Sequence, residues 1–397
     1  MSTPEPSDLI YLDHAATTPL DTDVLRAMSP YLAAEFGNPS SVYGLGQATH
    51  AALDAARATV ASVLNATPAE LVFTGGATES ANVALTGVAW AARQRNPQGP
   101  WPHLVTTAIE HSAVLETARW LAQLGFGLTV VPCDAEGIVA PEYVAAAIRP
   151  ETCLVSVMLA NNEVGSIQDI PAFAAVCQEH GVPLHCDATQ AAGSLALDVE
   201  ALGVDLLTLS AHKFYGPKGV GLLYVRAGTD VAWPVRGGGQ ESGRRGGTEN
   251  VAGIVGMAVA LDRAERFRPA YAAHCAALRD RLLAGLEERL PDVLLNGPPP
   301  GPRRLPNNLN VVLPGVQGET VLLALDMEGV AASAGSACTV GRNEPSHVLE
   351  AMGLSDAATR TSVRFTVGRG NTAGQIDDAV DVIAGVVERT RTLAAAR

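Results

Sequence analysis

A lysine stands where a buried strand is expected to end. The apolar residues Leu206, Leu207 and Leu209 predict a buried strand, and the polar residues Ser210, His212 and Lys213 follow it. A turn containing glycine and proline then leads to a second apolar strand over 220–225. Burial lowers the pKa of a lysine and frees its neutral amine to attack a carbonyl group, such as the aldehyde of pyridoxal 5′-phosphate (PLP). A surface lysine in a loop between two strands explains the same residues equally well, so the rest of the chain has to decide.

Other polar residues also collect where apolar strands end. Apolar runs alternate with helical segments through residue 225, which predicts an α/β fold with a mostly parallel sheet covered by helices. Ligands of open α/β sheets bind outside the carboxyl ends of the strands. The polar residues at these ends are Thr78, His111, Asn162, Asp187, Gln190, Ser210, His212 and Lys213. Together they predict one site assembled from distant parts of the chain.

A pair of glycines precedes one of the expected helices. Gly75 and Gly76 follow the predicted strand 71–74 and lead into a helix that starts near Ala77. The free backbone N–H groups at such a start suit a phosphate, and glycine lets a ligand approach the backbone closely. The alternative is an ordinary helix cap by Thr78. The turn is not a Walker loop, because no Gly-Lys-Ser/Thr follows it.

The composition indicates a large folded protein rather than one that binds nucleic acids or lies in a membrane. The 397 residues are 47% hydrophobic, which predicts a large core and two domains. The formal net charge of −14 disfavours a general surface for nucleic acids or anionic membranes. The N-terminal residues lack a basic region followed by an apolar one, and no apolar run reaches membrane-spanning length. We therefore expect a cytoplasmic protein.

The six cysteines differ in context. None forms a CxxC pair, so we expect no metal site. Cys338 stands among small residues without apolar periodicity, which is typical of an exposed and mobile thiol. The other five lie in apolar or helical contexts typical of small core residues: Cys133, Cys153, Cys177, Cys186 and Cys275.

The C-terminal part of the chain has a different pattern. We expect a large domain over 15–265 and a small domain from 1–14 and 266–397, which carries the cysteine loop at about 333–344. Arg364 lies in an alternating strand, where it is either a solvated residue or a fork that holds a substrate carboxylate. The loop 236–250, rich in glycine and arginine, reads as a hinge or as a second anion contact.

The chain resembles the cysteine desulfurases, PLP enzymes of fold type I in the class V aminotransferase group. The resemblance runs from residue 11 to about residue 369. Its last motif, with the segment 344–349, is similar to the NifS/IscS-type branch. The motifs, in order, are LDHAATTP (12–19), GATES (76–80), NNEVG (161–165), DATQ (187–190), HKFYGPKG (212–219) and GSAC (335–338). The resemblance implies a large domain with a mostly parallel sheet and a smaller α+β domain.

The resemblance also implies a role for each candidate residue. Lys213 would bind PLP covalently, Asp187 would pair with the pyridinium nitrogen, and His111 would stack on the ring and move protons. Gln190 would bond the ring oxygen. The phosphate would be held by Ala77, Thr78, Ser210 and His212, with Thr248 reaching in from the partner subunit of a homodimer. Arg364, helped by Asn38 and Asn162, would bind the substrate carboxylate.

The implied reaction converts L-cysteine to L-alanine. Cys338 would take the sulfur as a persulfide and pass it to an acceptor protein for iron–sulfur cluster assembly or tRNA thiolation. Position 246 is glycine where serine is common in the family, from which we expect a backbone-level effect only.

Three other interpretations use the same residues. Another PLP enzyme of this fold, such as a selenocysteine lyase or an aminotransferase, does not explain Cys338. A sulfur-relay or regulatory scaffold without turnover does not explain the joint presence of Lys213, Asp187 and His111. A metal hydrolase would have to be built on the nine histidines.

Overall fold

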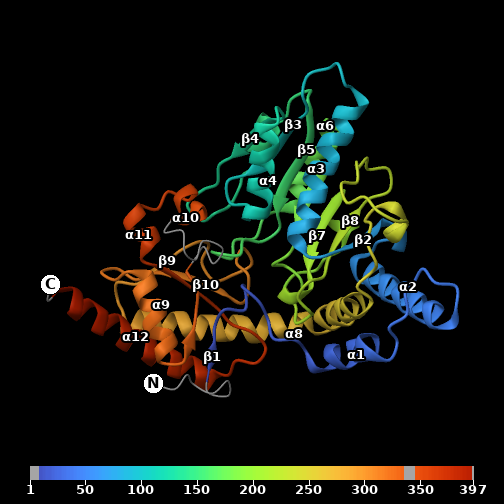
Figure 1. The fold of residues 1–397 in the computed structure, drawn as a ribbon. Coiled ribbons are helices and arrows are strands. Elements are labelled where there is room, and N and C mark those ends of the chain that lie inside the picture. Colours follow the sequence, from blue (N-terminus) through green and yellow to red (C-terminus); the bar gives the residue numbers. More distant parts are fainter. Residues whose placement is uncertain (1–8, 335–344, 396–397) are drawn as a thin grey trace.

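The computed structural model describes residues 9–334 and 345–395. Its largest element is a seven-stranded sheet at the centre of the molecule (Figure 1). Strand β8 runs antiparallel to both of its neighbours, and the other pairings are parallel. The α/β fold with a mostly parallel sheet is thereby confirmed. In spatial order the strands are β2 (Leu71–Thr74), β8 (Gly221–Val225), β7 (Leu206–Ser210), β6 (Leu184–Asp187), β5 (Thr152–Met158), β3 (His103–Thr107) and β4 (Gly127–Val131).

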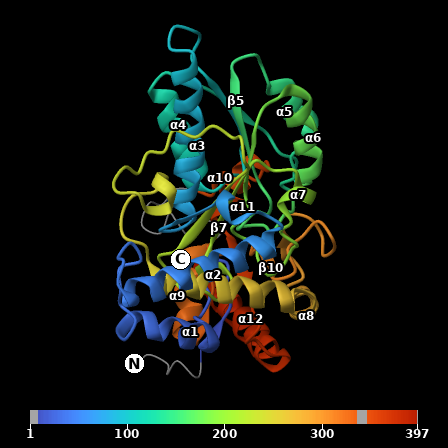
Figure 2. The ribbon, with the colours of Figure 1, turned by 90° about the vertical axis from the view of Figure 1, so that its right-hand side faces the viewer.

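Both faces of this sheet are covered because its strands carry apolar side chains on both sides. Val72 and Leu206 pack into one core cluster, whereas their neighbours Phe73 and Leu207 pack into another. The first cluster lies under α3 (Ala77–Arg95) and α4 (Ser112–Gln123). The helices over the opposite face include α5 (Pro141–Ala147), α6 (Ile170–His180) and the short α7 (Val199–Leu202). Figure 2 shows these two groups of helices with the sheet between them.

A smaller sheet organises the C-terminal part. Strand β10 (Asn308–Val312) pairs antiparallel with β12 (Ser362–Thr366) and with β9 (Leu294–Leu295). Beside it, β1 (Ile10–Tyr11) pairs parallel with β11 (Val330–Ala331), so the N-terminal strand joins the C-terminal part. The helices here are α9 (Gly318–Met327), α10 (His347–Ala351), α11 (Asp356–Arg360) and α12 (Ala373–Ala395).

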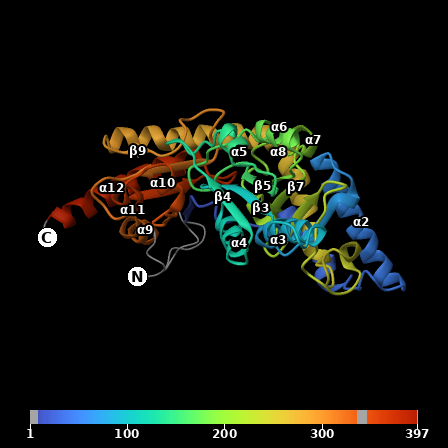
Figure 3. The ribbon, with the colours of Figure 1, turned by 90° about the horizontal axis from the view of Figure 1, so that it is seen from above.

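One long helix, α8 (Val251–Arg289), joins the two parts (Figures 1 and 3). Its first turns bury Met257 and Leu261 in the core of the large sheet, and its last turns bury Leu282 and Leu286 in the core of the small one. The helix is continuous across residue 265. A domain boundary at that position remains a prediction.

The remaining elements lie near the N-terminus or in turns. Helices α1 (Thr22–Ala33) and α2 (Gly44–Leu64) pack against α8. Among the described residues, every helix is too short or too polar to cross a membrane. Three short 3₁₀ helices complete the fold: η1 (Pro68–Glu70), η2 (Ala211–Lys213) and η3 (Gln240–Gly243).

Candidate active site

A cavity of about 810 Å³ opens at the carboxyl ends of the parallel strands. It extends to the small sheet, since Arg364 of β12 also lines it. Most of the residues predicted from the sequence to form one site lie in its wall: Ala77, Thr78, His111, Asn162, Asp187, Gln190, Ser210, His212, Lys213 and Arg364. The structure therefore brings these distant segments together around one space.

Lys213 ends the 3₁₀ turn η2, directly after β7. Its Nζ donates hydrogen bonds to the backbone oxygens of Ala15 and Ala16, over 2.6 and 2.7 Å. Those oxygens belong to the turn that follows β1, so the N-terminal segment holds the lysine at the cavity. Two residues on, Tyr215 has φ = 65°, in the left-handed region, and its backbone N–H donates to Thr18 Oγ1 over 2.7 Å. The lysine turn is therefore clamped from outside the sheet.

Asp187 is the last residue of β6 and is buried. Its Oδ1 accepts hydrogen bonds from the backbone N–H and the hydroxyl of Thr189. Within the described chain, Oδ2 has no hydrogen-bond donor, so one carboxylate oxygen remains for a ligand. His185, two residues earlier, points elsewhere: its ring nitrogens lie 2.8 Å from Ser156 Oγ and 2.9 Å from Thr208 Oγ1. Burial lowers the pKa of His185 to about 4, so this ring is a neutral bridge between strands.

The start of α3 has backbone donors without side-chain caps. Gly76 is the N-cap with φ = 154°, and no side chain caps the helix. The alternative of an ordinary helix cap by Thr78 is excluded, because Thr78 already lies inside the first turn. A side chain at position 221 would collide with the Gly76 backbone, its Cβ only 2.5 Å from the carbonyl carbon, so Gly221 allows β8 to pass this close. The N–H groups of Ala77 and Thr78 are left to bind an anion.

Two histidines line the cavity in neutral-ring arrangements. His111 is the N-cap of α4, and its Nδ1 accepts a hydrogen bond from Ala113 N over 3.1 Å. The neutral ring therefore carries its proton on Nε2. His212 lies 3.1 Å from Thr17 Oγ1 through Nδ1. Burial, together with the nearby cations Lys213 and Lys218, lowers the pKa of His212 to about 4.

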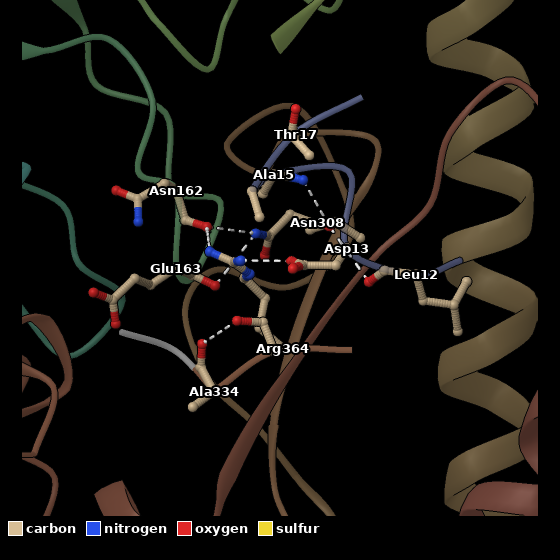
Figure 4. Close-up of polar contacts among 12 residues, drawn as sticks. Leu12, Asp13, Ala15, Thr17, Asn162, Glu163, Asn308, Ala334 and Arg364 are labelled. Atoms are coloured by element: carbon tan, nitrogen blue, oxygen red, sulfur yellow. Dashed lines mark hydrogen bonds and ion pairs between the residues drawn. The ribbon is translucent and has the colours of Figure 1, made fainter. Parts of the chain in front are cut away.

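Arg364 lines the cavity from the small sheet, and only 1% of its side chain is exposed. Its backbone is paired with Asn310 on β10 and with Ser333. Its Nη2 donates to Asp13 Oδ1 over 2.7 Å, and its Nη1 donates to the backbone oxygen of Asn162 over 2.9 Å (Figure 4). Figure 4 shows the side-chain amide of Asn162 turned away from the guanidinium. Asn162 thus touches Arg364 through its carbonyl, which the sequence interpretation did not anticipate.

Glu110 is a buried acid that the sequence interpretation missed. It precedes His111, and its Oε1 accepts hydrogen bonds from Thr107 Oγ1 and Met158 N over 2.8 and 2.7 Å. Its Oε2 is buried and has no partner among the described residues. Burial raises the pKa of Glu110 to about 8, and the nearby charge of Asp187 acts in the same direction. An acidic residue between an apolar strand and a helix start was the available signal.

Three predicted residues are not brought to this cavity. Asn38 is exposed, and its Oδ1 accepts a hydrogen bond from Ser40 N, as expected of a turn former. Thr248 is exposed as well and lies outside the cavity wall of this chain. Cys338 lies outside the described residues. The described residues on either side of it reach the site, since Ser333 pairs with Arg364 and His347 lines the cavity.

The described residues contain no group of three His, Cys, Asp or Glu side chains placed to hold a metal ion. The five cysteines among them are unpaired: Cys133, Cys153, Cys177, Cys186 and Cys275. Burial raises the pKa of each of these thiols, which disfavours them as nucleophiles.

Comparison with known proteins agrees with this site. The family model for aminotransferase class V matches residues 10–378. The chain is 44% identical to cysteine desulfurase IscS of Dictyoglomus turgidum, with 97% of this chain and 96% of that protein covered. A solved NifS-like protein superimposes with a TM-score of 0.89 at 36% identity, covering 96% of this chain and all of that one. A structure described as SspA in complex with cysteine superimposes with a TM-score of 0.79 at 36% identity, over 91% of this chain and all of that one. The chain therefore belongs to the class V aminotransferase family, in the group that contains the IscS cysteine desulfurases.

Proposed function

We propose that this protein is a PLP-dependent cysteine desulfurase that converts L-cysteine to L-alanine. The observation that carries the proposal is the shared cavity: Lys213, Asp187 and Arg364 line it from three separate segments. They offer an amine, a carboxylate and a guanidinium within one space. The family of class V aminotransferases is PLP-dependent, and a relative with 36% identity has been solved with cysteine.

The residues present fit PLP. The uncapped N–H groups of Ala77 and Thr78, with Ser210 and His212 beside them, suit its phosphate. The open Oδ2 of Asp187 suits a protonated pyridine nitrogen, and Lys213 suits the aldehyde. When bound there, PLP would supply an electron sink for the Cα of the amino acid. Gln190 Nε2 carries two hydrogens and donates one of them to Ala15 O. The other would contact the ring oxygen.

The chain's own residues then divide the work. Arg364 binds and orients the substrate carboxylate, because its planar guanidinium lines the cavity from the small sheet and can donate two parallel hydrogen bonds to a carboxylate. Lys213 moves the proton at the substrate Cα, after its Nζ leaves the carbonyl oxygens that now hold it. His111 serves beside it with a donor at Nε2.

Sulfur leaves through Cys338 in this proposal. The Cys338 thiolate attacks the substrate sulfur, so an S–S bond forms as the substrate C–S bond breaks. The electron pair of the C–S bond stays with Cβ, which takes up a proton, and L-alanine departs. Cys338 keeps the sulfur as a persulfide and passes it to an acceptor protein, for iron–sulfur cluster assembly or tRNA thiolation. We also propose a cytoplasmic homodimer in which Thr248, outside the cavity of its own chain, reaches the cavity of the partner.

The function is tested by supplying L-cysteine and a thiol reductant and measuring L-alanine and sulfide. We expect equal amounts of the two products, and no metal requirement. In Cys338→Ala the absorbance of bound cofactor should match that of the wild-type protein. Persulfide formation should be lost, because burial raises the pKa of each of the five described cysteines and keeps it a thiol. Cys133→Ala is the matched control and should keep wild-type persulfide formation. Wild-type persulfide formation by Cys338→Ala would show that the nucleophile is another residue.

A further inference from the structure

We propose that Asp13 is a positioning residue for the substrate carboxylate: it holds the guanidinium of Arg364 in the orientation that receives the substrate. The proposal rests on the proposed function, since it concerns the same cavity. Asp13 is not among the residues that line the cavity. Its influence on the substrate therefore has to pass through Arg364.

The first step is the burial of the pair. The side chain of Arg364 is 1% exposed and that of Asp13 is 17% exposed. A cation removed from water this completely requires a charged or hydrogen-bonded partner. Within the described ranges, Asp13 is the carboxylate at ion-pair distance from Arg364, with 2.7 Å between Oδ1 and Nη2. Asp13 therefore balances the charge of Arg364 when no substrate is present.

The second step is the count of donors on Arg364. A guanidinium has five N–H groups in one plane. Asp13 takes one on Nη2 and the Asn162 backbone oxygen takes one on Nη1, so each terminal nitrogen keeps one N–H. The Nε group is buried without a partner among the described residues. Because the two acceptors bind different nitrogens, the plane cannot rotate without breaking one of these bonds, and the remaining donors keep a fixed direction.

The third step is the rigidity of Asp13 itself (Figure 4). Residues 12–15 run alongside the end of β12, where Thr366 N donates to Leu12 O over 2.7 Å and Thr366 Oγ1 accepts from Ala15 N over 2.9 Å. The Tyr11 hydroxyl lies 3.0 Å from the backbone oxygen of Asp13 and 2.9 Å from that of Thr17. The carboxylate is thus presented from a turn tied at both ends.

The same turn reaches the other end of the proposed site. Its Ala15 and Ala16 oxygens accept the hydrogen bonds of Lys213. One short turn therefore contacts both the residue proposed to bind the substrate carboxylate and the residue proposed to act at its Cα. Asp13 therefore ties Arg364 to the same turn that holds Lys213.

The test is a double-mutant cycle between Asp13→Ala and Arg364→Ala, with KM and kcat for L-cysteine and the melting temperature measured for each. Loss of the anchor should raise KM at least about tenfold in Asp13→Ala and change kcat less, because the contact acts on ground-state binding of the carboxylate. In the Arg364→Ala background, Asp13→Ala should raise KM no further. Asp13→Asn keeps an oxygen acceptor, so its KM should lie between those of the wild-type protein and Asp13→Ala. This variant replaces Asp13→Ala in the cycle if the alanine variant does not fold.

Asp205→Ala is the matched control. Asp205 also faces an arginine, with 3.6 Å between its Oδ1 and Arg226 Nε, and its Oδ2 accepts from Leu184 N at the opposite end of the strands. This variant should lower the melting temperature and leave KM unchanged. An unchanged KM in Asp13→Ala, or an equal rise of KM with and without Arg364, would overturn the role of Asp13. Failure of the wild-type protein to release alanine would instead overturn the proposed function.

Discussion

The two ends of the cavity are built differently. At the large sheet, which we call the open end, some polar groups have hydrogen-bonding capacity left for a ligand. Asp187 has an oxygen without a donor in the described chain, and the first turn of α3 has uncapped N–H groups. At the small sheet, Arg364 is buried and already bonded to Asp13 and to the Asn162 carbonyl. The open end fits a group that arrives from solution and completes its hydrogen bonds. The closed end is preassembled by the protein, so it can orient a small substrate without first reorganising.

This difference predicts how the two ends respond to mutation. Substitutions at the open end should lower catalytic activity and cofactor retention with little change in stability, because the fold depends little on the groups left for a ligand. Substitutions at the closed end should weaken substrate binding and stability together, because the hydrogen bonds that orient Arg364 also stabilise the fold.

Lys213→Ala should have the largest effect, and it tests the open end. Removing the amine should lower alanine formation at least about a thousandfold, because one residue is proposed both to attach the cofactor and to move the proton. The melting temperature of the cofactor-free protein should fall only by the loss of the two hydrogen bonds to Ala15 O and Ala16 O. The measurements are alanine release, cofactor absorbance after gel filtration, and thermal unfolding.

Lys218→Ala is the control for that variant, since Lys218 is an exposed lysine of the same cavity wall. It should lower activity far less than Lys213→Ala does. Equal losses in both variants would mean that the general positive charge of the wall, rather than the Lys213 amine, carries the activity.

Arg364→Lys tests the closed end and should have the next largest effect. Lysine keeps the charge but cannot donate to Asp13, to the Asn162 carbonyl and to a substrate carboxylate in one plane. We expect KM for L-cysteine to rise by about a hundredfold and the melting temperature to fall, because buried acceptors lose their donor. Arg281→Lys is the matched control, since Arg281 forms a half-exposed pair with Asp377. A fall in kcat at constant KM in Arg364→Lys would contradict a role in carboxylate binding.

The open end was largely predictable from the sequence, whereas at the closed end the sequence pointed to Arg364 but not to its partner Asp13. Strand 71–74 has the predicted bounds because its apolar run is continuous and both of its faces are buried. The polar residue after each strand then falls at one edge of the sheet by topology alone. The pair of Asp13 and Arg364, in contrast, is separated by 351 positions and depends on how the segment after β1 packs beside β12.

Two further features of the structure have no pattern in the sequence that predicts them. The role of Asn162 in binding the substrate carboxylate stays a prediction; its contact with Arg364 is made by its backbone oxygen, which any residue type supplies. Helix α8 is a single helix whose two halves pack into different cores. Such contacts are set by tertiary packing, which local periodicity does not record.

Glu110→Gln should have the smallest effect, and it tests whether the open end also contains a preassembled part. Burial raises the pKa of Glu110 from 4.5 to about 8, so the folded protein keeps this proton at neutral pH while the unfolded chain releases it. Between pH 4.5 and 8 the folded state therefore binds more protons, and its stability falls as the pH rises through that window. Glutamine cannot ionise, and its amide oxygen can still accept the bonds from Thr107 and Met158.

The measurement is the free energy of unfolding in urea at several pH values for both proteins. The wild-type protein should lose stability relative to Glu110→Gln as the pH rises from 5 to 8, by no more than a few kcal/mol. Glu116→Gln, on the exposed face of α4, is the control and should follow the wild-type curve. Parallel curves for the wild-type protein and Glu110→Gln would mean that Glu110 is ionised in the folded state. Its charge would then lie beside Asp187, and the end of β6 would carry two negative charges toward the cofactor site instead of one.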